Sequence, residues 1–440
     1  MKKILSFILL VCVLNISEAK QTKEKPRVIE MTDGEIDDHS SMIRFLLYTC
    51  DIELLAIIET NSVFQRNGHS DELWLEKQLD AYEQVYPNLI IHNPDYPSAN
   101  KIRSVCFIGD EDENHLKAYP GKPVFPGKEV IYKPDNWNDT PGSDRIVEVL
   151  LEKDNRPVHI QAWGGGNTAA RAFYKLKSEY PSEYERAVSK VVMYNIWYQD
   201  GAGNYIETYH PKVKMLFCGS FSGTWNYGSQ KNTQGFIENN VKNHHGPLGA
   251  LYPQDYVSEG DSPAFLYSVA SGLRNNEEPG YGGWGGRFSK LEGFENVYID
   301  ALDDKDIRKS LQRWIRDANS DFQARMDWGV SSSYQDANHP AVIMLKGENN
   351  ITVKSGEKVK LNAKKSSDPD GDAITFAWWQ YKEAGTYEGV IEINHGSLPK
   401  AEFIAPKVNE PKTIHIILNV KDNGKPILRA YQRVIVNVIP

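Results

Sequence analysis

Short apolar runs alternate with longer segments of helical periodicity over the first two thirds of the chain. Residues 28–31 are typical of a buried strand, and residues 41–48 carry apolar side chains at helical spacing. Residues 52–58 have the composition of a second buried strand. Because strands that alternate with helices usually form parallel sheets, these segments predict a βαβ unit.

The alternation returns later in the chain. Residues 157–162 predict a strand, and the glycine-rich residues 163–166 predict a tight turn before a helix at 167–176. Further elements follow the same pattern, namely strands at 190–194 and 213–217 and a closing amphipathic helix at 311–328. We therefore predict an α/β domain over residues 26–330, with an open, mainly parallel sheet and flanking helices.

The pattern changes after Trp328. Residues 331–340 are polar and predict a linker. Short alternating runs then predict strands, with turn clusters such as 368–372 between them, at 358–363, 374–378, 413–420 and 433–438. Residues 341–440 are therefore expected to form a small Ig-like β-sandwich domain.

Residues 1–19 have the features of a signal peptide. A short basic start precedes an apolar run at 4–14, and Ser17, Glu18 and Ala19 fit a signal peptidase site. The run is shorter than the ~20 residues that span a bilayer, which disfavours the alternative of a membrane anchor. We expect export to the periplasm or the extracellular space, with no membrane anchor after cleavage.

Charge and cysteine content narrow the class of protein. With 50 Lys and Arg against 59 Asp and Glu, the net charge of −9 disfavours binding to a nucleic acid polymer. Beyond residue 19 the chain keeps Cys50, Cys106 and Cys218, which cannot all pair with one another. Cys50 and Cys218 lie beside apolar runs, which favours buried free thiols.

The most informative polar stretch, residues 32–38, directly follows the first predicted strand and contains Asp33, Asp37 and Asp38. In an open α/β sheet, ligands bind at the carboxyl ends of the strands. Clustered carboxylates repel one another, so either water solvates them or a cation holds them together, and calcium prefers such oxygen ligands. The alternative is a helix N-terminus, where acidic residues are also favoured. The spacing leaves both interpretations open.

The D-x-x-x-D-D pattern of Asp33 to Asp38 after a first strand resembles the nucleoside hydrolase superfamily. The resemblance implies a calcium ion held by Asp33, Asp38, the backbone carbonyl of Trp163 and Asp261. It also implies that Asp33 activates a water and that Asp37 holds sugar hydroxyls. Further candidates for substrate binding are Asn61, Asn167, Gln199, Asp200 and Trp284.

Several motifs in order resemble one exported bacterial, nucleoside-hydrolase-like family that is described as cellulose-binding. They are residues 32–38, 163–168, 259–263, 283–287 and 325–328, together with 367–372 and the Trp378–Trp379 pair. The chain departs from the superfamily pattern at Met31, at Gly34 and Glu35, and at Gly260, which stands where purine-cleaving members have a histidine that helps the leaving base.

These features predict a calcium-dependent hydrolase of glycosyl bonds, acting on a nucleoside or another sugar conjugate. An inverting enzyme also needs an acid for the leaving group, and Glu35, Glu259 and Asp200 are unranked candidates. The alternative function is non-catalytic binding of a cellulose-like polysaccharide. Related hydrolases commonly self-associate, so a homo-oligomer is a further open expectation.

Overall fold

The computed structural model describes residues 24–116, 121–123, 131–224, 233–253 and 259–440. The predicted signal peptide at 1–19 lies outside them. Within these ranges, none of the helices combines the length and the apolar character needed to cross a membrane.

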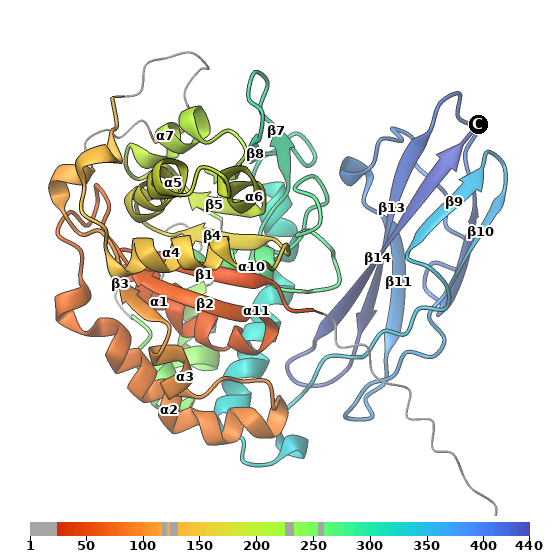
Figure 1. Ribbon diagram of the computed structural model, residues 1–440. Helices are drawn as coiled ribbons and strands as arrows, with labels where there is room; N and C mark the ends of the chain where they lie inside the picture. Colours follow the sequence, from red (N-terminus) through yellow and green to blue (C-terminus); the bar gives the residue numbers. More distant parts are fainter. Residues whose placement is uncertain (1–23, 117–120, 124–130, 225–232, 254–258) are drawn as a thin grey trace, which may run out of the picture.

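An eight-stranded sheet forms the centre of the first domain (Figure 1), with strand order β3-β2-β1-β4-β5-β6-β8-β7. Every neighbouring pair is parallel except β7 and β8. The strands are β1 (Arg27–Thr32), β2 (Glu53–Glu59), β3 (Cys106–Ile108), β4 (Val158–Ala162), β5 (Val191–Ile196), β6 (Lys214–Cys218), β7 (Phe288–Lys290) and β8 (Val297–Asp300). The predicted α/β class, with a mainly parallel sheet, is confirmed.

Helices cover both faces of this sheet (Figure 1). They are α1 (Ile36–Leu46), α2 (Trp74–His92), α3 (Ala99–Arg103), α4 (Pro141–Leu151), α5 (Asn167–Glu179), α6 (Tyr184–Ser189), α7 (Ala202–Tyr209), α8 (Thr233–Ile237), α9 (Gly246–Ala250), α10 (Ser262–Ser268) and α11 (Lys309–Val330). Alternate residues of β1 enter different cores: Val28 packs with α1, α2, α10 and α11, whereas Ile29 and Met31 pack with α4 to α7.

The C-terminal domain contains two small sheets, β10–β12 and β11–β13–β14–β9. Its strands are β9 (Asn350–Lys354), β10 (Lys358–Asn362), β11 (Thr375–Gln380), β12 (Lys400–Ile404), β13 (Lys412–Lys421) and β14 (Arg429–Ile439). The pairs are antiparallel except β14 with β9. Inward-facing residues such as Ile414, Ile416 and Leu418 build its core, which confirms the predicted β-sandwich class.

Buried polar contacts join the two domains side by side (Figure 1). Arg433 of β14 is fully buried and donates hydrogen bonds from Nη2 to the carbonyl oxygens of Tyr281 (2.7 Å) and Gly282 (2.8 Å). The hydroxyl of Tyr381 donates to Oδ2 of Asp303 at 2.6 Å. The C-terminal domain is therefore anchored to the loop that precedes β7 and to the loop that follows β8.

A chain of hydrogen bonds also connects α2 with the C-terminal domain. Nε2 of His92 lies 3.0 Å from the carbonyl oxygen of Ser331, and its Nδ1 lies 3.0 Å from Nε2 of His339. Nδ1 of His339 lies 2.9 Å from Oδ1 of Asp370 in the turn between β10 and β11. The predicted linker at 331–340 thus makes specific contacts with both domains.

Candidate metal and substrate site

Three of the predicted acidic residues meet at the carboxyl end of β1. Asp37, Asp38 and Asp261 each offer a carboxylate oxygen, and these three oxygens lie within 4.8 Å of one another. Asp37 and Asp38 belong to the first turn of α1, and Asp261 immediately precedes α10. Because α1 and α10 pack against each other, side chains from distant parts of the chain share one site.

The turn between β1 and α1 holds Asp38 firmly. The hydroxyl of Thr32 and the backbone N–H of Asp33 both donate to Oδ1 of Asp38, the latter at 3.2 Å. Gly34 has a φ of +73°, and a Cβ there would lie 2.8 Å from Cβ of His69. The chain therefore needs glycine at this position to make the turn that brings the acids together.

Two carboxylate oxygens at the site are buried with no hydrogen-bond partner, namely Oδ2 of Asp33 and Oδ2 of Asp261. Both residues are only 1% exposed. Burial raises the pKa of Asp33, and burial together with the neighbouring acids raises that of Asp261. The same causes raise the pKa of Asp37 to about 7. Buried acids of this kind either hold protons or neutralise a cation.

The donor set fits a calcium ion, which takes carboxylate and carbonyl oxygens. It differs in one respect from the set that the resemblance implies. Asp37, expected at the sugar, groups with Asp38 and Asp261, whereas Asp33 lies beside the glycine-rich turn after β4. A Cβ at Gly164 would lie 2.6 Å from Cγ of Asp33, so this turn packs directly on the acid.

Asn61 and Asn167, the two predicted asparagines, contact each other. Both are fully buried, and Nδ2 of Asn167 donates to Oδ1 of Asn61 at 2.6 Å. Asp200 accepts from the backbone N–H groups of Asn167 (2.9 Å) and Ala202 (2.8 Å). The Asp200 carboxylate therefore fixes the start of α5 and α7 and is committed to the protein's own backbone.

The predicted carbonyl ligand, Trp163, contacts the predicted substrate residue Gln199. The side-chain amide of Gln199 donates to the carbonyl oxygens of Trp163 and of Ile196, the latter at 3.0 Å. Oε1 of Gln199 is buried with no hydrogen-bond partner. A carbonyl oxygen has two lone pairs, so Trp163 keeps one available, and its role as a metal ligand stays a prediction.

Comparison with known proteins identifies the family. The model "Cellulose-binding Sde182, nucleoside hydrolase-like domain" matches residues 27–288, and "Cellulose-binding protein Sde0182, C-terminal domain" matches residues 358–438. The chain belongs to the Sde182 nucleoside hydrolase-like family. A search of curated proteins gave no match.

One solved structure agrees with this family. A nucleoside hydrolase-related hypothetical protein from Saccharophagus degradans, described as associated with carbohydrate metabolism, shares 32% identity over 94% of this chain and 100% of its own, with a TM-score of 0.81. The type III effector XopQ, complexed with adenosine diphosphate ribose, is 10% identical over 69% of this chain and 95% of its own, with a TM-score of 0.36.

Gly260, where this Sde182-family chain departs from the superfamily pattern, lies against the acids. A Cβ at this position would lie 2.5 Å from Oδ2 of Asp37 and 3.3 Å from the ring of Phe221. No side chain fits there unless Asp37 moves. The glycine that stands in place of the histidine thus goes together with a different local packing around Asp37.

Two further site candidates are buried within the protein. Trp284, predicted at the substrate, is 4% exposed and packs in the hydrophobic core, where it lines a pocket between the two domains. Glu259, a candidate acid, is fully buried and forms an ion pair with Arg44, whose Nε lies 2.6 Å from Oε2 of Glu259. Because its carboxylate is engaged in this pair, Glu259 is a poor candidate for the general acid that protonates the leaving group.

Sequence reasoning missed Arg44. It lies on α1 among apolar neighbours, where a single arginine resembles a residue at the edge of a helical face. Its role depends on Glu259, which is 215 residues away in the chain, so no local signal could have shown it.

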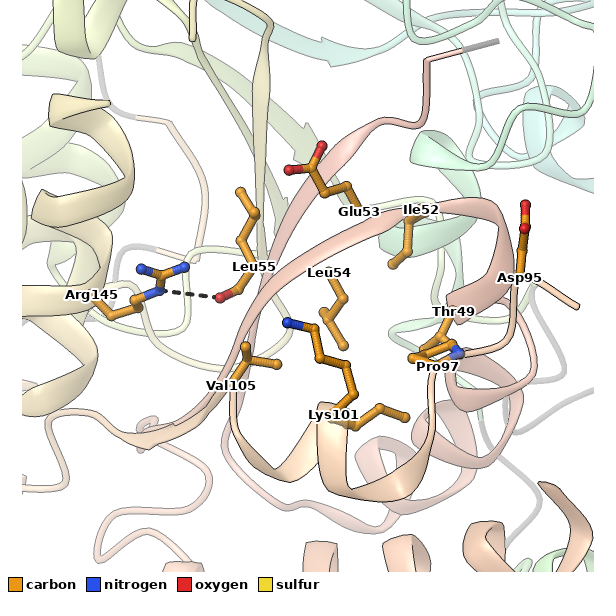
Figure 2. A pocket seen from close by; sticks show the side chains of 11 residues that line it. Thr49, Ile52, Glu53, Leu54, Leu55, Asp95, Pro97, Lys101, Val105 and Arg145 are labelled. Atoms are coloured by element: carbon orange, nitrogen blue, oxygen red, sulfur yellow. Dashed lines mark hydrogen bonds between the residues drawn. The ribbon is translucent and has the colours of Figure 1, made fainter. Parts of the chain in front are cut away.

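A separate pocket of about 300 Å³ lies at the opposite end of β2 (Figure 2). Glu53, Leu54 and Leu55, which begin this strand, line it, and Nε of Arg145 donates to the carbonyl oxygen of Leu55 at 3.3 Å. Because the acids follow the carboxyl end of β1, which is parallel to β2, this pocket is not part of the candidate site.

Proposed function

We propose that this protein hydrolyses glycosyl bonds of a nucleoside or another sugar conjugate, outside the cytoplasm, with a calcium ion bound at the acidic cluster. The observation that carries the proposal is the meeting of Asp37, Asp38 and Asp261 beside the buried, unpartnered oxygen of Asp33. Each unpaired buried carboxylate destabilises the folded protein, so this arrangement favours a functional site over a purely structural role.

Each acid has a distinct role in this proposal. Asp33, Asp38, Asp261 and the carbonyl of Trp163 would hold the calcium ion, which when bound lowers the pKa of a water and orients sugar hydroxyls. Oδ2 of Asp33 accepts the proton of the attacking water as a general base. Asp37 accepts a hydrogen bond from a sugar hydroxyl at the edge of the cluster.

We assign the leaving-group proton to Glu35. Of the three carboxyl groups considered for this role, Glu259 is paired with Arg44 and Asp200 accepts two backbone hydrogen bonds. Burial and the neighbouring acids raise the pKa of Glu35 to about 8, so its carboxyl group holds a proton at neutral pH. A protonated carboxyl group can donate to a leaving oxygen or nitrogen.

The second candidate function is non-catalytic binding of a polysaccharide. Gly260 favours it, because the position offers no group to help a nucleobase leave. The description of the family as cellulose-binding also supports it.

Calorimetry with calcium tests the proposal. We expect the mature protein to bind one ion at the cluster, Asp38→Asn to lose that binding, and Asp368→Asn, in the acidic turn of the C-terminal domain, to keep it. Inosine, uridine and p-nitrophenyl glycosides then serve as substrates, and cleavage should disappear with a chelator and in Asp33→Asn. Calcium binding that survives in Asp38→Asn would refute the site. Binding without cleavage of any substrate would favour the second function.

A further inference from the structure

A pocket of about 310 Å³ lies at the junction of the two domains. The first domain contributes Asp51, the loop 269–272, Trp284 and two residues of α11, Asp321 and Arg325. The second domain contributes β14 residues 429–432 and the chain segment that enters it. Neither domain forms this pocket alone.

The charged side chains in the wall of this junction pocket are already paired within the protein. Arg325 forms ion pairs with Asp51 (2.8 Å) and Asp321 (2.7 Å). Arg429 pairs with Asp317 at 2.7 Å. Two arginines and two aspartates line the pocket, so the formal charge of its lining is zero. A neutral, hydrogen-bonding ligand therefore fits the pocket better than an ion does.

Trp284 contributes to the wall from the first domain. It is 4% exposed, and its indole Nε1 is buried with no hydrogen-bond partner.

The remaining lining combines apolar and polar groups. Val269, Ala341 and Ile343 are apolar, whereas Ser271 and Gln432 offer hydroxyl and amide groups. A sugar ring presents the same combination, with C–H groups on its faces and hydroxyls around its edge. Small-molecule pockets measure about 300–1,000 Å³, so this one suits a ligand of one or two rings.

We propose that the junction pocket binds a sugar residue of a neutral oligosaccharide, at a site separate from the acidic cluster. Such a site gives the C-terminal domain a function, because its strand β14 supplies part of the wall. The contacts of Arg433 with the carbonyl groups of Tyr281 and Gly282 hold the two halves of the site together. The proposal does not depend on hydrolysis or on a cation.

Titration of the full mature chain with cellobiose, a neutral disaccharide, tests the proposal. Ala270 is exposed and lines the pocket, so Ala270→Trp fills it and should weaken cellobiose binding at least tenfold. Ala373→Trp, at an exposed position outside the pocket, is the matched control and should bind as the wild type does. Asp38→Asn should also leave the affinity for cellobiose unchanged, because the acidic cluster is a different site.

Hydrogen–deuterium exchange on the wild-type protein gives a second readout that needs no variant. Cellobiose should slow exchange in segments 269–272 and 429–432. Loss of cellobiose binding in Asp38→Asn with retention in Ala270→Trp would overturn the proposal and place the sugar at the acids. Absence of binding by the wild type at 10-millimolar cellobiose, or protection confined to other segments, would overturn it as well.

Discussion

The buried ion pair between Arg44 and Glu259 offers a direct test of how the acidic site is held. Both residues are fully buried. Oε1 of Glu259 accepts hydrogen bonds from Nη2 of Arg44 (3.1 Å) and from the hydroxyl of Tyr252 (2.8 Å), and Oε2 accepts from the hydroxyl of Ser262 (3.0 Å). Asp261, a member of the acidic cluster, lies between Glu259 and Ser262 in the chain. The pair therefore positions the segment that carries this acid.

Glu259→Gln keeps the shape of the side chain and removes its charge. Arg44 then loses the counter-charge of Glu259 and keeps its hydrogen bonds to neutral groups, the carbonyl oxygen of Ala318 (3.2 Å) and Oδ1 of Asn319 (2.8 Å). Breaking a buried pair in this way costs about 3–5 kcal/mol. We expect the free energy of unfolding in urea to fall by about this amount, and calcium binding to weaken because Asp261 loses its support.

The control is Glu402→Gln, which breaks an exposed pair with Lys358 (2.9 Å). Because surface ion pairs contribute little, this substitution should leave the urea midpoint nearly unchanged. Arg44→Leu combined with Glu259→Gln should recover part of the stability lost in the single variant, because no buried charge is then left alone. The reasoning is refuted if Glu259→Gln costs no more than Glu402→Gln does, or if the double variant is the least stable of all.

Three other predictions follow from the same site and its surroundings. Gly260→Ala places a Cβ 2.5 Å from Oδ2 of Asp37, so calorimetry should show that the calcium affinity falls about tenfold or more (~1.4 kcal/mol). In the control Gly280→Ala the nearest atom to the new Cβ lies at 3.8 Å, and this variant should bind calcium as the wild type does. A calcium ion beside Asp37 favours the ionised form of this acid, whose pKa burial and Asp33 raise to about 7, so calcium affinity should rise from pH 6 to pH 8. Calorimetry in buffers of different ionisation enthalpy should show proton release on binding, and zero release would contradict the prediction. Burial lowers the pKa of His159 to about 4, so between ~pH 6.5 and ~pH 4 the unfolded chain binds a proton that the folded protein excludes. The free energy of unfolding should therefore fall by about 3 kcal/mol as the pH drops through this range. Chemical unfolding of His159→Gln should show a smaller fall.

The periodicity of the chain was sufficient to predict elements in both domains. The predicted strand at 413–420 corresponds to β13 (Lys412–Lys421), and the predicted helix at 311–328 corresponds to α11 (Lys309–Val330). Alternation and helical spacing are local properties, and a strand or helix must follow them to bury one face. The predicted helix at 41–48 began too late, because α1 starts at Ile36 with acidic residues in its first turn.

Local chemistry likewise identified Asp33, Asp37 and Asp38, because they follow one strand within a single turn and need no distant partner to be recognised. Asp261 was linked to them only through family resemblance, since nothing in its own neighbourhood points to residues so far away. The packing of α1 against α10 makes that link physical.

The amino-acid sequence by itself thus determined the class of fold, the order of the elements and the acidic turn after the first strand. Only the tertiary structure decided that Asp37 groups with Asp38 and Asp261, that Glu259 is bound to Arg44, and that Trp284 lines the junction of the domains. The physical reason is that periodicity and turn chemistry act between neighbours in the chain. Burial, ion pairing and the shape of a pocket depend instead on which distant surfaces pack together.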